Sequence, residues 1–349
     1  MSPLADQLLT WFDVHGRTNL PWQIGRKSQV NVYHIWLSEV MLQQTQVNTV
    51  IDYFNRFTHH FPTLNSLANA SEDAVLAQWA GLGYYSRARN LHKAAKIISH
   101  DYQGLFPQNF EQALALPGIG KSTAGAILAL GFKQKHAILD GNVKRVLSRV
   151  HQVKGHYAQH TTLKELWSLA EYHTPDARID HYTQAIMDLG ATMCKRSKPH
   201  CEHCPLHNLC KSNIEQTQEE YPNPKPKKSK PTRSIAMLAF INKGSVYLQK
   251  RPSQGIWGGL WSLTECEDTP HTINQSMLEF DRTGIIIKQL PVFKHTFTHY
   301  HLHIRPIAVQ CSSSSAQFYP INQITLGMPK PVSKILSQIT ALTHSSLRE

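Results

Sequence analysis

Two different hydrophobic periodicities divide the chain. In the first part, apolar residues recur at helical spacing, as in residues 4–14, and they fill an almost wholly apolar run from Ile35 to Leu42. After residue 233 the pattern changes to short alternating runs, among them Ile235 to Ile241 and Phe297 to Ile307, which are typical of strands. The sequence therefore predicts a helical region followed by a smaller region with both strands and helices.

A Pro- and Lys-rich segment separates the two patterns. Residues 221–233 read YPNPKPKKSKPTR, a composition that cannot build a core and that favours a semi-extended chain. A chain of 349 residues is long enough for two separate cores. We therefore predict two domains joined by a linker. The predicted bounds are a helical domain over residues 1–216, a linker over 217–233 and an α+β domain over 234–349.

Composition adds a strong positive charge to this picture. The chain carries 36 Lys and Arg residues against 24 Asp and Glu residues, a net charge of +12, which favours a polyanionic partner. The sequence shows no apolar run long enough to span a bilayer. Residues 1–12 lack a basic segment followed by an apolar one, as a secretory signal would have. We therefore expect an intracellular protein that has no membrane partner.

A glycine-containing turn opens the segment with the most informative chemistry. Gly118 and Gly120 can adopt backbone angles that are closed to residues with a Cβ, and they let another backbone approach closely. The turn leads into a helix of small residues predicted from Lys121 to Phe132. Because the first amides of such a helix lack intrahelical partners, they make a ready site for a phosphate.

Asp140 follows this predicted phosphate site as a lone carboxylate. It stands directly before a basic helix that carries Lys144, Arg145 and Arg149. The ordinary role of an Asp-Gly pair at this place is a turn or a helix N-cap. A phosphate site followed by a carboxylate instead indicates chemistry on a nucleic acid. Both interpretations of Asp140 are open on these residues alone.

Glu39 is a second carboxylate in an unusual place, since it interrupts the apolar run from Ile35 to Leu42. It could lie on the one exposed stripe of an amphipathic helix. Alternatively, burial within an apolar helix would raise the pKa of its carboxyl group, which suits a general acid that works near neutral pH.

Four cysteines crowd into a short, loop-rich segment. They are Cys194, Cys201, Cys204 and Cys210, with the spacing Cys-x6-Cys-x2-Cys-x5-Cys. This arrangement predicts a single metal or cluster site, which could hold either zinc or an iron–sulfur cluster.

Several of these segments resemble one family of DNA repair enzymes. Residues 116–127 resemble the helix-hairpin-helix of the endonuclease III superfamily of base-excision glycosylases, and SEVMLQQTQV around Glu39 narrows the resemblance to the MutY-type adenine DNA glycosylases. The resemblance implies that Asp140 is the catalytic aspartate and Glu39 the catalytic acid. It also implies that Gln44 wedges into the base stack and that Tyr84 intercalates beside the lesion.

The same resemblance extends to the cysteines and to the second domain. The cysteine spacing is similar to that of the family's [4Fe–4S] loop, which favours this cofactor over zinc. The region after the linker resembles the family's Nudix-like domain, in which Phe297, Thr298 and His299 would read 8-oxoguanine. Residues 281–284 lack the glutamates with which a Nudix hydrolase binds its metal, so the resemblance implies recognition without hydrolysis.

Position 122 distinguishes two branches of the superfamily. Bifunctional relatives have a lysine nucleophile there and cleave the DNA strand, whereas this chain has Ser122. Lys121 is adjacent, but one residue along a helix turns a side chain by about 100°, so we expect it to face a phosphate or solvent. The loop between Trp22 and Glu39 is a few residues longer than is common in the family.

The resemblance as a whole implies a monomeric enzyme that binds double-stranded DNA with A:8-oxoguanine or A:G mispairs, in the cytoplasm at the nucleoid. It would remove the adenine without cleaving the strand, and Ser122 would belong to its catalytic site. The expected DNA contacts are Gln44, Tyr84, Gly118, Gly120, Lys121 and Lys144. The two alternative functions are those of an endonuclease III-like lyase and of a non-enzymatic DNA-binding iron–sulfur protein.

Overall fold

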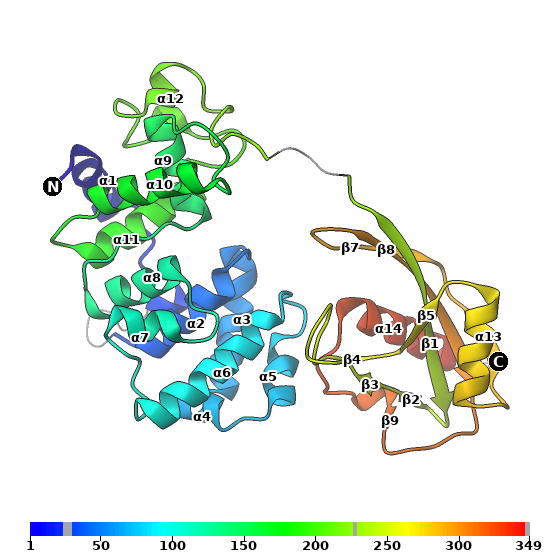
Figure 1. Cartoon of the computed structure of the whole chain (residues 1–349). Helices are drawn as coiled ribbons and strands as arrows, with labels where there is room; N and C mark the ends of the chain where they lie inside the picture. Colours follow the sequence, from blue (N-terminus) through cyan, green and yellow to red (C-terminus); the bar gives the residue numbers. More distant parts are fainter. Residues whose placement is uncertain (24–29, 226–228, 346–349) are drawn as a thin grey trace. The chain divides into compact units, whose positions relative to one another are not determined.

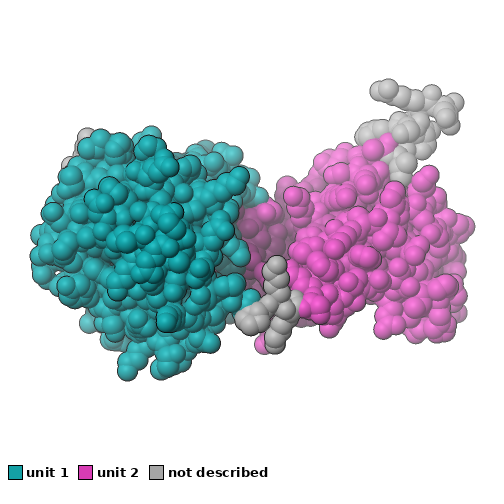
Figure 2. Space-filling model, turned by 90° about the horizontal axis from the view of Figure 1, so that it is seen from above, with its two compact units in different colours: residues 1–69, 90–226 teal, residues 70–89, 227–349 magenta. Residues whose placement is uncertain are grey.

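A computed structural model describes residues 1–23, 30–225 and 229–345. The chain forms two compact units, which Figure 2 colours separately. Unit 1 comprises Met1–Asn69 and Asn90–Pro226, and unit 2 comprises Ala70–Arg89 and Lys227–Glu349. Most of the long loop after Trp22 lies outside the described residues, and so does part of the predicted linker.

Unit 1 is helical, as the first periodicity predicts (Figure 1). Helix α8 matches the predicted helix from Lys121 to Phe132, and the apolar run from Ile35 to Leu42 lies within α2. The main helices are α1 (Pro3–His15), α2 (Val32–Leu42), α3 (Val47–His60), α4 (Leu64–Ala68), α7 (Phe110–Ala115), α8 (Lys121–Phe132), α9 (Gly141–His151), α10 (His160–His173), α11 (Ile179–Asp188) and α12 (Lys211–Ile214). Helix α6 (Ser86–Asp101) also belongs to unit 1 from Asn90 onward.

The core of unit 1 is built around the apolar helices. Helix α8 is buried on most of its surface and contacts both α2 and α11. A Cβ at Gly125 would lie 2.6 Å from the carbonyl oxygen of Ala137, so only glycine lets α8 approach the segment that leads to Asp140. A second cluster joins α1, α9, α10 and α11. Unit 1 therefore holds its helix starts in fixed positions.

Unit 2 contains a mixed sheet, which has seven strands within the described residues. Its central strand β1 (Thr232–Asn242) pairs in parallel with β8 (His301–Gln310) and antiparallel with β5 (Thr264–Glu267). Alternate residues of β1 face α13 (Pro270–Phe280) and α14 (Lys330–Ser345), so the two helices cover opposite faces of the sheet. The other strands are β2 (Ser245–Tyr247), β6 (Ile285–Gln289), β7 (Phe293–Thr296) and β9 (Phe318–Pro320), and β3 (Gln249–Lys250) and β4 (Trp261–Ser262) form a small hairpin.

The compact units differ from the predicted domain bounds in two respects. Residues 70–89, including α5 (Glu72–Trp79), belong to unit 2, where Asp73 pairs with Lys250 at 2.7 Å. The first part of the predicted linker is bound to unit 1, because Arg149 donates to the carbonyl oxygens of Gln218 and Tyr221 at 3.0 and 2.9 Å. The predicted bounds themselves stay a prediction.

The alternating run from Phe297 to Ile307 is a strand only in part. Residues Phe297 to Tyr300 form a turn between β7 and β8, closed by a hydrogen bond from the Phe297 amide to the Tyr300 carbonyl oxygen at 2.9 Å. The strand begins at His301 and runs to Gln310. Within the described residues, the helices are all too short or too polar to cross a membrane.

Candidate active site

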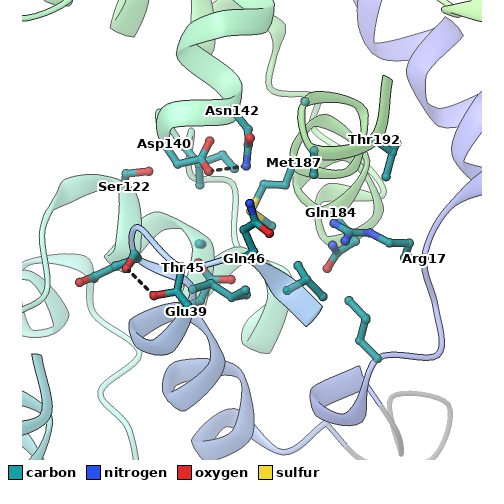
Figure 3. A pocket seen from close by; sticks show the side chains of 18 of the residues that line it. Arg17, Glu39, Thr45, Gln46, Ser122, Asp140, Asn142, Gln184, Met187 and Thr192 are labelled. Carbon is teal, nitrogen blue, oxygen red and sulfur yellow. Dashed lines mark hydrogen bonds between the residues drawn. The ribbon is translucent and has the colours of Figure 1, made fainter. Parts of the chain in front are cut away.

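A pocket of about 820 Å³ opens between α2, α8, α11 and the start of α9 in unit 1. The three residues predicted to form the catalytic site, Glu39, Ser122 and Asp140, all line it. Figure 3 shows that they enter the pocket from different elements. The fold therefore brings together side chains that lie far apart in the sequence.

Glu39 is half-buried on α2 and lies on the pocket side of this helix. Its neighbours Ser38 and Val40 are buried, and so is most of the rest of α2. The carboxyl group therefore lies at the wall of the pocket, on a helix that is otherwise mostly buried.

Asp140 is the N-cap of α9. Its Oδ1 accepts a hydrogen bond from the Val143 amide at 2.8 Å, and its Oδ2 accepts one from Nδ2 of Asn142 at 3.1 Å. Burial raises the pKa of this carboxyl group, while the hydrogen bonds and the nearby Arg145 oppose the rise. The N-cap interpretation is thus confirmed, and it leaves the carboxylate at the wall of the pocket.

Ser122 and Lys121 point in different directions, as their positions on a helix predict. The Ser122 hydroxyl accepts a hydrogen bond from the Leu139 amide at 2.9 Å, which fixes the residue that precedes Asp140. The Lys121 ammonium instead pairs with Glu171 at 2.9 Å and lies 4.0 Å from the ring centroid of Trp167. Lys121 is not among the residues that line the pocket.

The two glycines of the turn differ from each other. Gly118 has a φ of +80°, which confirms the predicted backbone conformation, and a Cβ there would lie 2.8 Å from the Cβ of Asn90, a side-chain atom. Gly120 has ordinary extended angles, with φ −96° and ψ 172°, and the prediction of a special backbone conformation is wrong for it. Gly120 is the N-cap of α8, has no side-chain cap, and faces open space.

The two residues predicted to enter the base stack, Gln44 and Tyr84, each have a strained backbone conformation. Gln44 has a φ of 58° and Tyr84 a φ of 49°, a left-handed region that residues with a Cβ rarely adopt. Gln44 is exposed in the turn after α2 of unit 1. Tyr84, in unit 2, is 44% exposed, and the Arg87 guanidinium lies 5.5 Å from its ring centroid. Such strain is common at functional positions.

Two arginines of α9 have a role that the sequence did not reveal. Arg145 donates to the carbonyl oxygens of Cys194 and Gly190, each at 2.7 Å. Arg149 donates to the carbonyl oxygen of Lys195 at 2.7 Å and to the sulfur of Cys194 at 3.3 Å. These arginines therefore bind the cysteine segment to the helix that Asp140 caps.

Lys144 is the third basic residue that the sequence predicts on this helix, beside Arg145 and Arg149. It is half-buried, and its ammonium lies 5.4 Å from the ring centroid of Tyr157.

The four cysteines line one pocket whose walls also include Val146, Val150, Leu189, Met193 and Leu206. Burial, and then the other thiols, raise the pKa of Cys204 to about 12. In the described part of the chain, no three His, Cys, Asp or Glu side chains converge closely enough for a single ion. The four thiols therefore lie around one cavity with largely apolar walls.

The predicted recognition residues occupy the turn between β7 and β8 of unit 2. Thr298 and His299 are exposed at its tip. Phe297 is half-buried, stacks on Tyr300 with ring centroids 4.7 Å apart, and lies 5.2 Å from the ring of Trp257. The turn is thus held by an aromatic cluster and presents its polar side chains outward.

Comparisons with known proteins agree with this architecture. Residues 37–171 match the HhH-GPD superfamily of base excision DNA repair proteins, and residues 236–338 match the NUDIX domain. The adenine DNA glycosylase of Buchnera aphidicola subsp. Acyrthosiphon pisum (strain APS) is 38% identical over 94% of this chain and 95% of its own length. The chain belongs to the adenine DNA glycosylase family. It is thus a base excision repair glycosylase, and its fold class is the predicted one.

Other relatives of this glycosylase cover parts of the chain. The Homo sapiens adenine DNA glycosylase is 41% identical over 61% of this chain and 40% of its own length. The structure of a thermostable thymine-DNA glycosylase is 26% identical, with a TM-score of 0.52 over 61% of this chain and 95% of that one. A non-covalent endonuclease III–DNA complex, 20% identical with a TM-score of 0.52, covers 62% of this chain and 95% of that one and shares the fold.

Sequence reasoning missed a second group of residues in the glycosylase pocket. Arg17 donates to the buried carboxylate of Asp188 through its backbone amide at 2.8 Å and through its guanidinium at 2.6 and 2.9 Å. Gln184 donates to the same carboxylate at 2.9 Å. Arg17 and Gln184 both line the pocket. Because 171 residues separate Arg17 from Asp188, no local pattern could have paired them.

Proposed function

We propose that this glycosylase removes adenine mispaired with 8-oxoguanine or guanine in double-stranded DNA, by hydrolysis of the N-glycosidic bond and without strand cleavage. The observation that carries the proposal is that Glu39 and Asp140 line one pocket from different helices. The names of the relatives support adenine as the base.

In the proposed mechanism the adenine leaves the duplex and enters the pocket. Glu39 donates a proton to a ring nitrogen, which lets the base leave with the electron pair of the glycosidic bond. Ionised Asp140 stabilises the positive charge that develops on the sugar, as paired carboxylates do in other glycosidases. A water oxygen then bonds to the anomeric carbon, and the proton that water loses restores the Glu39 carboxyl group.

The absence of strand cleavage follows from the residue at position 122. A hydroxyl group cannot form a Schiff base with the sugar, and Lys121 does not line the pocket that Ser122 lines. Ser122 contributes to the site by fixing Leu139, the neighbour of Asp140.

We propose that the four cysteine thiolates hold a [4Fe–4S] cluster. When bound, the cluster supplies a covalent cross-link for the loop and an electron-transfer centre. Arg145 and Arg149 connect this loop to α9, at whose start Asp140 lies. The cluster would thereby support the position of the catalytic carboxylate.

The proposed DNA contacts divide between lesion and backbone. Thr298 and His299 would bond the edge of 8-oxoguanine, with Phe297 beside it. Gln44 would wedge into the base stack, and Tyr84 would intercalate beside the lesion. The backbone contacts that we propose are Gly118, Gly120, Lys121 and Lys144. We further propose that the enzyme works as a monomer at the nucleoid.

A single-turnover assay on four duplexes tests the proposal. The duplexes contain A:8-oxoguanine, A:G, A:T or thymine glycol:A, and the products are separated with and without hot alkali. We expect breaks only after alkali, fastest at adenine opposite 8-oxoguanine and next opposite guanine. Direct nicking at thymine glycol would assign the protein to the lyases. Tight binding without any product would make it a recognition protein.

A further inference from the structure

The face of the sheet that α13 covers changes from apolar to polar beyond the end of that helix. Under α13 the face is apolar and includes Leu238, Phe240, Ile307 and Val309. The β7–β8 hairpin and the start of β1 extend past α13 (Figure 1). Because side chains alternate along a strand, the residues of β8 that continue this face are Arg305, His303 and His301.

Polar and basic residues form two rows on this extension. His301 pairs with Thr296 of β7 and Thr232 of β1, and His303 pairs with Lys294 and Ser234 on the same strands. We call these six residues the hairpin strip. Leu302 and Ile304, which alternate with the histidines, are buried on the opposite face against the α14 cluster. The hairpin strip therefore faces away from that core.

The charges around the hairpin strip are mostly positive. Lys294 is exposed, and Lys230 reaches the recognition turn, where its ammonium donates to the Phe297 carbonyl oxygen at 3.0 Å. Both lysines lie close enough to lower the pKa of His301, after the effect of its burial. Asp268 neutralises Arg305 at 2.6 Å, at the border with α13.

This surface offers hydrogen-bond donors to an acceptor-rich partner. Lysine ammonium groups, serine and threonine hydroxyls and imidazole rings are all able to donate, and phosphate oxygens only accept. Most protein–DNA hydrogen bonds to the backbone come from such groups. The turn of Phe297 to Tyr300 connects directly to the hairpin strip, so a duplex whose base meets the turn tip would bring its nearby phosphates to the strip.

We propose that the hairpin strip and Lys230 bind the phosphate backbone of duplex DNA next to the base that the turn contacts. The inference rests on the proposed function in that it takes duplex DNA as the substrate. The contact is independent of base identity, so it contributes equally to damaged and undamaged duplexes.

The dependence of binding on salt tests this inference. The full chain carrying Lys230→Gln and Lys294→Gln is titrated with an undamaged A:T duplex and an A:8-oxoguanine duplex at several salt concentrations. Each lost phosphate contact reduces the slope of log K against log salt by about 0.9, so we expect a decrease of about 1 to 2 on both duplexes. Lys294→Arg, which keeps the charge, should keep the slope of the unsubstituted protein.

A matched control lies on the other side of the sheet. Lys288 is exposed on β6 and pairs with Ala308, which belongs to the α14 side, so Lys288→Gln should leave the slope unchanged. A double variant that behaves like this control overturns the inference, and so does one that weakens binding only to the 8-oxoguanine duplex. Failure of the unsubstituted protein to excise adenine would contradict the proposed function alone, since the slopes are measured by binding.

Discussion

At the scale of single residues, burial disfavours the ionised form of the Asp140 carboxyl group. Burial is the largest influence on its pKa and raises it from 3.8. A raised folded-state pKa means that the unfolded chain loses this proton first as pH rises. The ionised group therefore destabilises the fold at neutral pH, and this cost disappears below the unfolded pKa.

Asp140→Asn should consequently separate stability from activity. The amide oxygen can still accept the Val143 hydrogen bond, and no buried charge remains, so we expect the free energy of unfolding at pH 7 to rise. Loss of the carboxylate should slow adenine excision by about a thousandfold or more. Urea unfolding and single-turnover rates measure the two effects. A variant that is less stable at pH 7, or that keeps its rate, would contradict this account of Asp140.

Gln44 has a backbone conformation that is unfavourable for any residue with a Cβ. With a φ of 58°, Gln44→Gly should stabilise the fold by about 1 kcal/mol, because glycine adopts this region without strain. The variant should excise adenine more slowly, since the proposed wedge is gone. Gln44→Ala should lose activity similarly without gaining stability.

Lys133→Gly is the control for the stability effect, since Lys133 ends α8 with a φ of 57°. It should stabilise by a similar amount and leave excision unchanged. Equal stability of Gln44→Gly and Gln44→Ala in urea unfolding would show that strain at this position is negligible.

At the scale of elements, the start of α9 depends on the π-helical turn Leu189–Met193. A Cβ at Gly190 would lie 2.5 Å from the Cβ of Asn142 and 3.1 Å from its Cα. Gly190→Ala should therefore displace the start of α9, destabilise the fold by about 1 to 3 kcal/mol and slow excision. Thermal unfolding and single-turnover rates together measure this change.

Gly141 supplies the matched control, because it also lies beside Asp140 but a Cβ there would meet nothing within 4 Å. Gly141→Ala should be nearly neutral for both stability and excision. If Gly190→Ala were as active as Gly141→Ala, the contact between the π-helical turn and α9 would have no part in positioning Asp140.

The elements also show what could be predicted from the sequence. Helix α8 and the strand β1 follow from local periodicity, and the Asp140 cap follows from an Asp-Gly pair before a basic helix. The roles of Arg145 and Arg149 could not be predicted, because a charged helix face looks the same whether its cations meet DNA or carbonyl oxygens. The pair of Arg17 and Asp188 depends on tertiary contacts alone.

At the scale of the whole molecule, helices α1, α9 and α10 of unit 1 meet at a pair of histidines. Nε2 of His151, at the end of α9, lies 2.9 Å from Nε2 of His173, at the end of α10. Nδ1 of His173 lies 2.9 Å from the hydroxyl of Ser2, which caps α1. A hydrogen bond between two imidazole nitrogens needs one of them to be unprotonated, so this junction requires a neutral histidine.

Acid should therefore weaken the helical unit. Burial, and then His151, lower the pKa of His173 from 6.5 to about 4. A depressed histidine pKa means that the unfolded chain binds the proton first, so stability is retained above pH 6.5 and falls as pH approaches 4. His173→Gln removes this titration while keeping polar groups at the junction. Urea unfolding of the variant should show a shallower loss of stability between pH 6.5 and 4.5. The control His59→Gln, at an exposed position, should lose stability as steeply as the unsubstituted protein. If His173→Gln lost stability as steeply as the His59 control, the junction would not be the acid-sensitive part of the fold.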